Sequence, residues 1–115
     1  MLESKLQIKE GQTVAAVHAP YALPLNAKSA AADSADVVLL FVANLAELKE
    51  RVGILTEAGR RGATLWLAYP KAKQLGTDLN RDIIHDLMPA YGLDAVRQVA
   101  IDDAWSALRF KTLAP

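Results

Sequence analysis

A chain of 115 residues has the length of one domain and can bury a hydrophobic core. Apolar residues make up 52% of it and charged residues 23%, which excludes disorder as a global description. Lys plus Arg number 13 and Asp plus Glu number 13, so the formal net charge is zero. A general attraction to nucleic-acid phosphates is therefore disfavoured, whereas self-association as a homo-oligomer is permitted. We expect a single α/β domain over residues 1–115.

The chain contains no cysteine, which excludes disulfides, iron–sulfur clusters and cysteine-based zinc sites. Its two histidines, His18 and His85, are too few to assemble a metal cluster by spacing. The first ten residues mix charges with single apolar residues, unlike a signal peptide, and the longest apolar run, 37–43, is too short to cross a bilayer. We expect a cytoplasmic protein with no membrane segment, metal or cofactor.

Two strands open the predicted sheet. Residues 13–17 follow a turn at Gly11 and favour a first strand. Residues 37–42 are apolar without alternation, which is typical of a central parallel strand that is buried on both faces. Between them, Pro20 and Pro24 favour a loop, whereas residues 27–32 are compatible with a short helix, and the sequence leaves both alternatives open.

The clearest helix comes next. Asn44 is a good N-cap, and Glu47 lies three residues later, as a capping box requires. An apolar face then repeats at helical spacing, at Leu45, Leu48, Val52 and Leu55. Gly59 and Gly62 supply the end of the helix.

A third strand and a second helix follow. Residues 63–69 are mostly apolar and are closed by Pro70, which predicts another buried strand. Thr77 or Asp78 is then expected to cap a helix that ends at Gly92. The apolar face of that helix would be Leu79, Ile83, Leu87 and Tyr91.

The C-terminal region favours a β-hairpin. Residues 96–101 and 105–111 are two short runs separated by Asp102-Asp103-Ala104, where adjacent aspartates favour turn hydrogen bonds over a cation site. The whole order of elements predicts a three-layer Rossmann-like α/β domain. Its mostly parallel sheet would have about five strands, with the antiparallel hairpin at one edge.

Several polar side chains stand where the predicted strands end, which is where open α/β sheets bind ligands. A lysine just beyond a strand end and beside a helix start can hold an anionic group. The structural alternative is a set of caps, turn residues and solvated charges, with a tryptophan covering the sheet edge and an arginine reaching solvent. The ligand-binding candidates are His18, Asn44, Tyr69, Lys71, Thr77, Asp78, Trp105 and Arg109.

No catalytic motif accompanies these candidates. The turn after the first strand, His-Ala-Pro-Tyr at 18–21, lacks the glycine pattern of a dinucleotide or phosphate grip. The sequence also contains neither a GxSxG elbow nor an HExxH pair. We therefore assign no catalytic residue and no metal ligand.

Three strings resemble those of an uncharacterised family of small bacterial proteins. They are Leu-Trp-Leu-Ala-Tyr-Pro-Lys at 65–71, Thr-Asp-Leu at 77–79 and Trp-Ser-Ala-Leu-Arg-Phe at 105–110, with aspartates just before the last. The family pairs an LWxAYPK strand with a TDL helix start and a DxxWSxLRF strand. It brings no established activity, so the resemblance bears on the fold rather than on the function.

The order of elements also resembles a truncated class I methyltransferase domain. Residues 62–66, Gly-Ala-Thr-Leu-Trp, would match its GG-x-L-W strand. The chain departs from that pattern where residues 18–21 replace the glycine-rich loop, and where the acidic ribose-binding region is missing. The resemblance therefore implies a methyltransferase-like architecture without its cofactor site.

Two functional hypotheses follow. The first is a small non-catalytic binding or protein-interaction domain with a degenerate methyltransferase-like core. The alternative is a small enzyme or ligand-binding protein that acts on an anionic small molecule at the carboxyl ends of the strands. In the alternative, His18, Lys71 and Asp78 must converge on one concave pocket.

Overall fold

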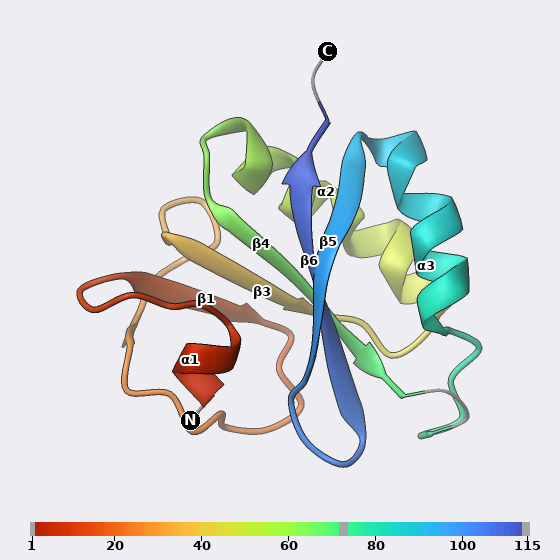
Figure 1. Ribbon diagram of the computed structural model, residues 1–115, viewed down its shortest axis with the longest axis horizontal. Helices are drawn as coiled ribbons and strands as arrows, with labels where there is room; N and C mark the ends of the chain where they lie inside the picture. Colours follow the sequence, from red (N-terminus) through yellow and green to blue (C-terminus); the bar gives the residue numbers. More distant parts are fainter. Residues whose placement is uncertain (1, 72–73, 114–115) are drawn as a thin grey trace.

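The protein is built around one six-stranded sheet in the order β2-β1-β3-β4-β6-β5 (Figure 1). Its computed structural model describes residues 2–71 and 74–113. Strands β1 to β4 run parallel, whereas β6 runs antiparallel to both of its neighbours, β4 and β5. The strands are β1 (Thr13–Val17), β2 (Lys28–Ser29), β3 (Val37–Phe41), β4 (Thr64–Pro70), β5 (Leu93–Ala100) and β6 (Trp105–Thr112).

Three α-helices accompany the sheet within the described residues. They are α1 (Leu2–Lys5), α2 (Leu45–Arg60) and α3 (Arg81–Leu87), the last continued by a 3₁₀ turn, η1 (Met88–Tyr91). Figure 1 shows α2 and α3 beside the C-terminal half of the sheet and α1 near β1. Side chains of α2 and α3 belong to one hydrophobic cluster and those of α1 to a second, so the two groups of helices cover opposite faces.

The central strand β3 is buried on both faces, as its unbroken apolar run predicted. Val38 and Leu40 join the cluster beneath α2 and α3, and Val37, Leu39 and Phe41 join the cluster on the other face. Every residue of the strand is at most 1% exposed. Both faces of the sheet must therefore be covered for this strand to leave water.

The predicted three-layer Rossmann-like arrangement is wrong. Over residues 2–71 and 74–113, the sheet is mixed and has six strands rather than about five, and no second layer of long helices covers the face opposite α2. That face is covered instead by α1 and by an extended stretch whose Leu23, Leu25 and Ala27 pack against the sheet at alternate positions. Pro20 and Pro24 explain the difference, because they keep this stretch out of a helix.

The short helix α1 is fastened to the sheet through Trp66. The indole Nε1 of Trp66 donates a hydrogen bond of 3.0 Å to the carbonyl oxygen of Leu6. Both residues are 0% exposed. Leu2 and Leu6, two of the single apolar residues among the first ten, are thus part of the core.

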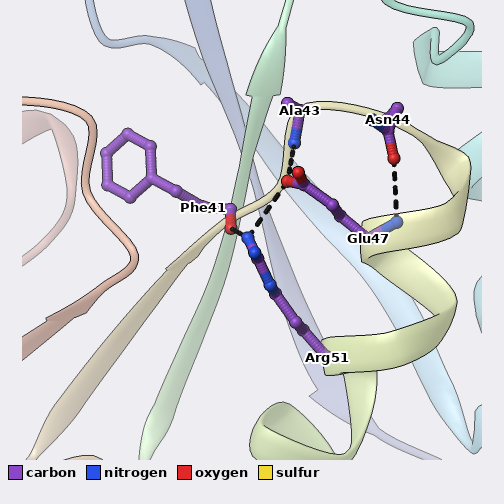
Figure 2. Close-up of polar contacts among 5 residues, drawn as sticks. All are labelled: Phe41, Ala43, Asn44, Glu47 and Arg51. Carbon is purple, nitrogen blue, oxygen red and sulfur yellow. Dashed lines mark hydrogen bonds and ion pairs between the residues drawn. The ribbon is translucent and has the colours of Figure 1, made fainter.

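The helix α2 begins as its capping pattern predicted (Figure 2). The Asn44 Oδ1 atom accepts from the backbone N–H of Glu47 at 2.9 Å, and Glu47 Oε1 accepts from the N–H of Ala43 at 2.8 Å. Arg51 Nη1 then donates to Glu47 Oε1 at 3.0 Å and to the carbonyl oxygen of Phe41 at 3.3 Å. The cap thereby joins the end of β3 to the first two turns of α2.

The predicted start of the second long helix is also wrong. The N-cap of α3 is Asn80, whose side chain accepts from the N–H of Ile83 at 2.9 Å. Thr77 instead closes a local turn by accepting from the N–H of Leu79 at 3.0 Å. Asp78 accepts at 2.8 Å from the N–H of Leu45, in the first turn of α2. Thr77 and Asp78 therefore both accept hydrogen bonds from backbone N–H groups, but not from those of α3. The local sequence does not distinguish these roles from capping of α3.

The C-terminal hairpin is confirmed, with β5 and β6 paired antiparallel and a bulge between Ala95 and Arg97. Asp102 Oδ1 accepts from the N–H groups of Ala104 at 2.8 Å and Trp105 at 2.9 Å. Its turn role therefore agrees with the expectation. Among the helices of the described residues, none is both long and apolar enough to cross a membrane.

Two glycines of α2 should respond differently to substitution by alanine. A Cβ on Gly53 would meet nothing within 4 Å, whereas one on Gly59 would lie 2.8 Å from Thr112 Oγ1 and 3.1 Å from Leu65 Cδ1. Gly53→Ala should raise the free energy of unfolding by about 0.5–1 kcal/mol through helix propensity. Gly59→Ala should gain less than Gly53→Ala or lose stability, because the Thr112 and Leu65 side chains must move away. Urea unfolding of both variants tests this, and equal gains would contradict the close approach of α2 to β6.

The Trp66 hydrogen bond gives a second prediction. In Trp66→Phe the buried Leu6 carbonyl oxygen loses its hydrogen bond from the indole N–H, and no other side chain of the described residues donates to it. The free energy of unfolding should fall by about 1–3 kcal/mol. Faster amide exchange should be confined at first to the N-terminal residues. Trp105→Phe is the matched control, because the described residues give that indole no hydrogen bond. Equal losses in the two variants would show that ring size alone matters.

Candidate functional site

A cavity of about 650 Å³ lies between the start of α3 and the hairpin, beside the carboxyl end of β4. We call it the α3–β6 cavity. The end of β4, the residue after it, the first turn of α3, β5 and β6 all contribute to its wall. It is lined by Tyr69, Lys71, Asn80, Arg81, Asp82, Gln98, Val99, Ala100 and Ser106.

Strand register explains why the polar side chains from the sheet meet here. Ser106 of β6 is paired with Tyr69 of β4 on one side and with Ala100 of β5 on the other. Paired residues present their side chains to the same face, and so does Gln98, two positions before Ala100. This row therefore lies on the face that α3 covers.

A chain of long hydrogen bonds crosses the cavity. Arg81 Nη1 donates to Gln98 Oε1 at 3.3 Å, and Gln98 Nε2 donates to the hydroxyl oxygen of Tyr69 at 3.4 Å. Both distances are at the long end for N–H···O bonds. A ligand atom that forms a shorter hydrogen bond with Arg81 or Gln98 can therefore replace either contact with little loss of free energy.

The cavity carries a net positive charge. Lys71 and Arg81 contribute two cations and Asp82 one carboxylate, and the Arg81 Nε to Asp82 Oδ1 distance is 3.9 Å. Burial raises the pKa of the Tyr69 hydroxyl, and the nearby Arg81 cation only partly opposes that rise. The Tyr69 side chain is thus a neutral hydrogen-bond donor throughout the physiological range.

The structure brings two of the predicted site residues into this cavity, Tyr69 and Lys71. His18 lies elsewhere, exposed in the turn after β1 with a left-handed backbone (φ 58°). The remaining candidates on this side, Asn44, Thr77 and Asp78, hold backbone N–H groups as described above.

Trp105 and Arg109 share the opposite face of β6. Trp105 packs its ring edge-on against Phe41, with centroids 5.2 Å apart, and is 8% exposed. It covers the sheet rather than offering a free surface for stacking. Arg109 Nη1 donates to Gln7 Oε1 and is half-buried.

Sequence reasoning missed Arg81, Gln98 and Ser106. The position of Arg81 could have indicated a functional role. A cation in the first turn of a helix interacts unfavourably with the positive end of the helix dipole, so helix stability does not explain it. Gln98 and Ser106 carried no such signal. Only strand register places them beside Tyr69.

The constellation required by the enzyme hypothesis is not gathered in this cavity. Lys71 lines it, but neither His18 nor Asp78 is among its described lining residues. The Asp78 carboxylate points instead to the first turn of α2. Within residues 2–71 and 74–113, no three His, Asp or Glu side chains are grouped so as to hold a metal ion.

A second polar contact lies at the same end of the sheet. The hydroxyl of Tyr21 donates to Asp102 Oδ2. Burial, with the Asp102 hydrogen bond and charge, raises the pKa of Tyr21 to about 12. Burial alone would raise the pKa of the Asp102 carboxyl, but hydrogen bonds from Tyr21, Ala104 and Trp105 outweigh it and hold that pKa below its ordinary value.

Comparison with known proteins adds no relative. No protein-family model matches the chain, and no curated protein matches it. The two resemblances drawn from the sequence therefore stay expectations, and the function has to be argued from the cavity itself.

The Tyr21–Asp102 contact predicts a pH response. Because the folded-state pKa of Tyr21 is raised, its contribution to stability should be complete below about pH 10 and be lost between about pH 10 and 12. Titration of tyrosinate absorbance should show one group near 12 that Tyr21→Phe removes. Asp102→Asn should lower this pKa part of the way, because burial remains.

A matched control is Tyr69→Phe, which should leave the Tyr21 titration in place. Asp102→Asn should also reduce the loss of stability in acid, because a carboxyl with a depressed pKa loses its contribution as the pH falls through that pKa. An unchanged Tyr21 titration in Asp102→Asn would contradict the contact.

Proposed function

We propose that this protein is a small non-catalytic binding domain whose ligand is an anionic small molecule held in the α3–β6 cavity. The observation that carries the proposal is the pairing of two cations, Lys71 and Arg81, with neutral polar groups of Tyr69, Gln98 and Ser106 in one concavity. Ligand sites typically combine a partly apolar wall with a few convergent polar groups.

The size and wall of the cavity support a small ligand. Its volume of about 650 Å³ falls within the usual range of small-molecule sites. Ala100 and the Tyr69 ring provide apolar surface, while the Tyr69 hydroxyl and the Gln98 amide provide donors. We infer a molecule with one anionic end, held between Lys71 and Arg81, and a flatter neutral part against the sheet.

Binding is favoured over chemistry by the titratable groups in the wall. Burial raises the pKa of Tyr69, which makes its phenol a poorer proton donor at neutral pH. The Asp82 side chain is 89% exposed, so it is solvated rather than poised as a general base. Lys71 and Arg81 supply charge for recognition and electrostatic steering.

A degenerate methyltransferase-like core, in a form that lacks the second helical layer over the described residues, belongs to the same proposal. It is supported by the order β3, α2, β4, α3 and closing hairpin, and by the turn at 18–21, which has no glycine-rich loop.

A cytoplasmic location is also proposed, on the sequence alone. Dimerisation through sheet edges is less favoured, because β2 has two residues and β5 carries a bulge.

The proposal predicts charge-dependent binding. Calorimetry and thermal-shift measurements against nucleotides, S-adenosylmethionine, sugar phosphates and dicarboxylates should identify at least one saturable ligand. Lys71→Gln and Arg81→Gln should each weaken its binding by about tenfold or more, because each removes a charge-assisted hydrogen bond. Tyr69→Phe should weaken binding less, since it removes a neutral donor.

Arg60→Gln is the matched control, because Arg60 is an exposed cation of α2 paired with Glu57 at 2.7 Å, outside the cavity. Its variant should bind as the unaltered protein does. A ligand whose affinity falls equally in Arg60→Gln and Arg81→Gln would rule out the cavity as its site. Turnover of any ligand would overturn the non-catalytic part of the proposal.

A further inference from the structure

The face of the sheet opposite the α3–β6 cavity carries two arginines on neighbouring strands. Arg97 of β5 and Arg109 of β6 are direct partners in the antiparallel ladder, and Trp66 of β4 continues the same row. Paired residues have Cβ atoms about 4.5–5.5 Å apart, and like charges placed directly opposite are unfavourable. This sequence keeps such a pair at a sheet edge.

A third cation reaches this face from the N-terminal segment. Lys5, at the end of α1, extends its Nζ to within 3.4 Å of the carbonyl oxygen of Ala100 in β5. Two residues later, Gln7 adopts a left-handed backbone (φ 57°) and accepts from Arg109 through its side-chain Oε1. A non-glycine residue in this conformation is strained, and here the strain accompanies an oriented guanidinium.

In the part of the chain that the structure describes, no carboxylate forms an ion pair with these three cations. The ion pairs formed within residues 2–71 and 74–113 involve Arg51, Arg60 and Arg81. Asp94 lies on this face too, but it is paired in the ladder with Lys111, the next cation along β6. The face therefore keeps a local positive excess in a chain whose net charge is zero.

We propose that Lys5, Arg97 and Arg109 form a second anion site that binds phosphate groups. The planar guanidinium donors fit phosphate oxygens in pairs, and a lysine adds a point charge beside them. A phosphate between Arg97 and Arg109 removes the repulsion that the ladder imposes. The same chemistry is offered by a free oligophosphate and by the backbone of a single-stranded nucleic acid.

Edge protection is the competing explanation for Arg97. Charged residues and bulges on an edge strand prevent pairing with another copy, and β5 has both. That role requires neither Arg109 nor Lys5, and gives no reason for Gln7 to hold the Arg109 side chain. The two explanations predict different behaviour of the same variants.

The test measures binding of tripolyphosphate by calorimetry and of a labelled single-stranded oligonucleotide by anisotropy, over a range of salt concentrations. Arg97→Gln, Arg109→Gln and Lys5→Gln should each weaken binding about three- to tenfold, and Arg97→Glu should weaken it further. For an oligonucleotide, losing one contact should reduce the salt slope by about 0.7.

Arg60→Gln is the control, and it should bind phosphate at this face as the unaltered protein does. Binding of tripolyphosphate alone that the Arg97 and Arg109 variants weaken supports the site with a small phosphate as ligand. Salt-dependent oligonucleotide binding that the same variants weaken supports it with a nucleic acid. Binding of neither probe overturns the proposal. Binding that stays unchanged in the Arg97 and Arg109 variants also overturns it. If Arg97→Gln self-associates while its phosphate binding is unchanged, Arg97 protects the sheet edge instead.

Discussion

The structure depends on burying β3 and β4 on both faces. Every residue of β3 is excluded from water, and so is β4 from Leu65 to Pro70. A helix covers one face of these strands easily, because α2 follows β3 directly and returns the chain to the start of β4. The other face is covered by α1 and an extended segment, fastened through the hydrogen bond from Trp66 to Leu6. Without either cover, apolar strands would face solvent.

The same constraint divides the polar residues between structural and available roles. Asn44 and Asp78 stabilise the start of α2, and Asp102 fixes the turn of the hairpin, so these side chains have backbone partners. The α3–β6 cavity is lined at the carboxyl end of β4 by polar side chains that do not cap a helix or fix a turn, such as those of Tyr69, Lys71 and Gln98. Its cations, Lys71 and Arg81, lie on loop and helix positions that no core contact requires.

Local patterns predicted much of the fold. The bounds of β1 were predicted residue for residue, those of β3 and β4 to within one residue, and the capping box at Asn44 located α2. The helix α3 was misplaced because Thr77, Asp78 and Asn80 are all good caps, and only packing chooses among them. Two of the cavity residues, Tyr69 and Lys71, were anticipated because they lie at the carboxyl end of a buried strand and just after it.

The sequence by itself determined which strands are buried and where α2 begins, because hydrophobic period and capping act over a few residues. The tertiary structure alone decided what covers the second face, that β6 enters the sheet beside β4, and that Ser106 and Gln98 face Arg81. It also placed Arg97 opposite Arg109 through a bulge in β5. These features depend on register between segments far apart in the chain, and shifting a strand by one residue would turn each side chain to the other face.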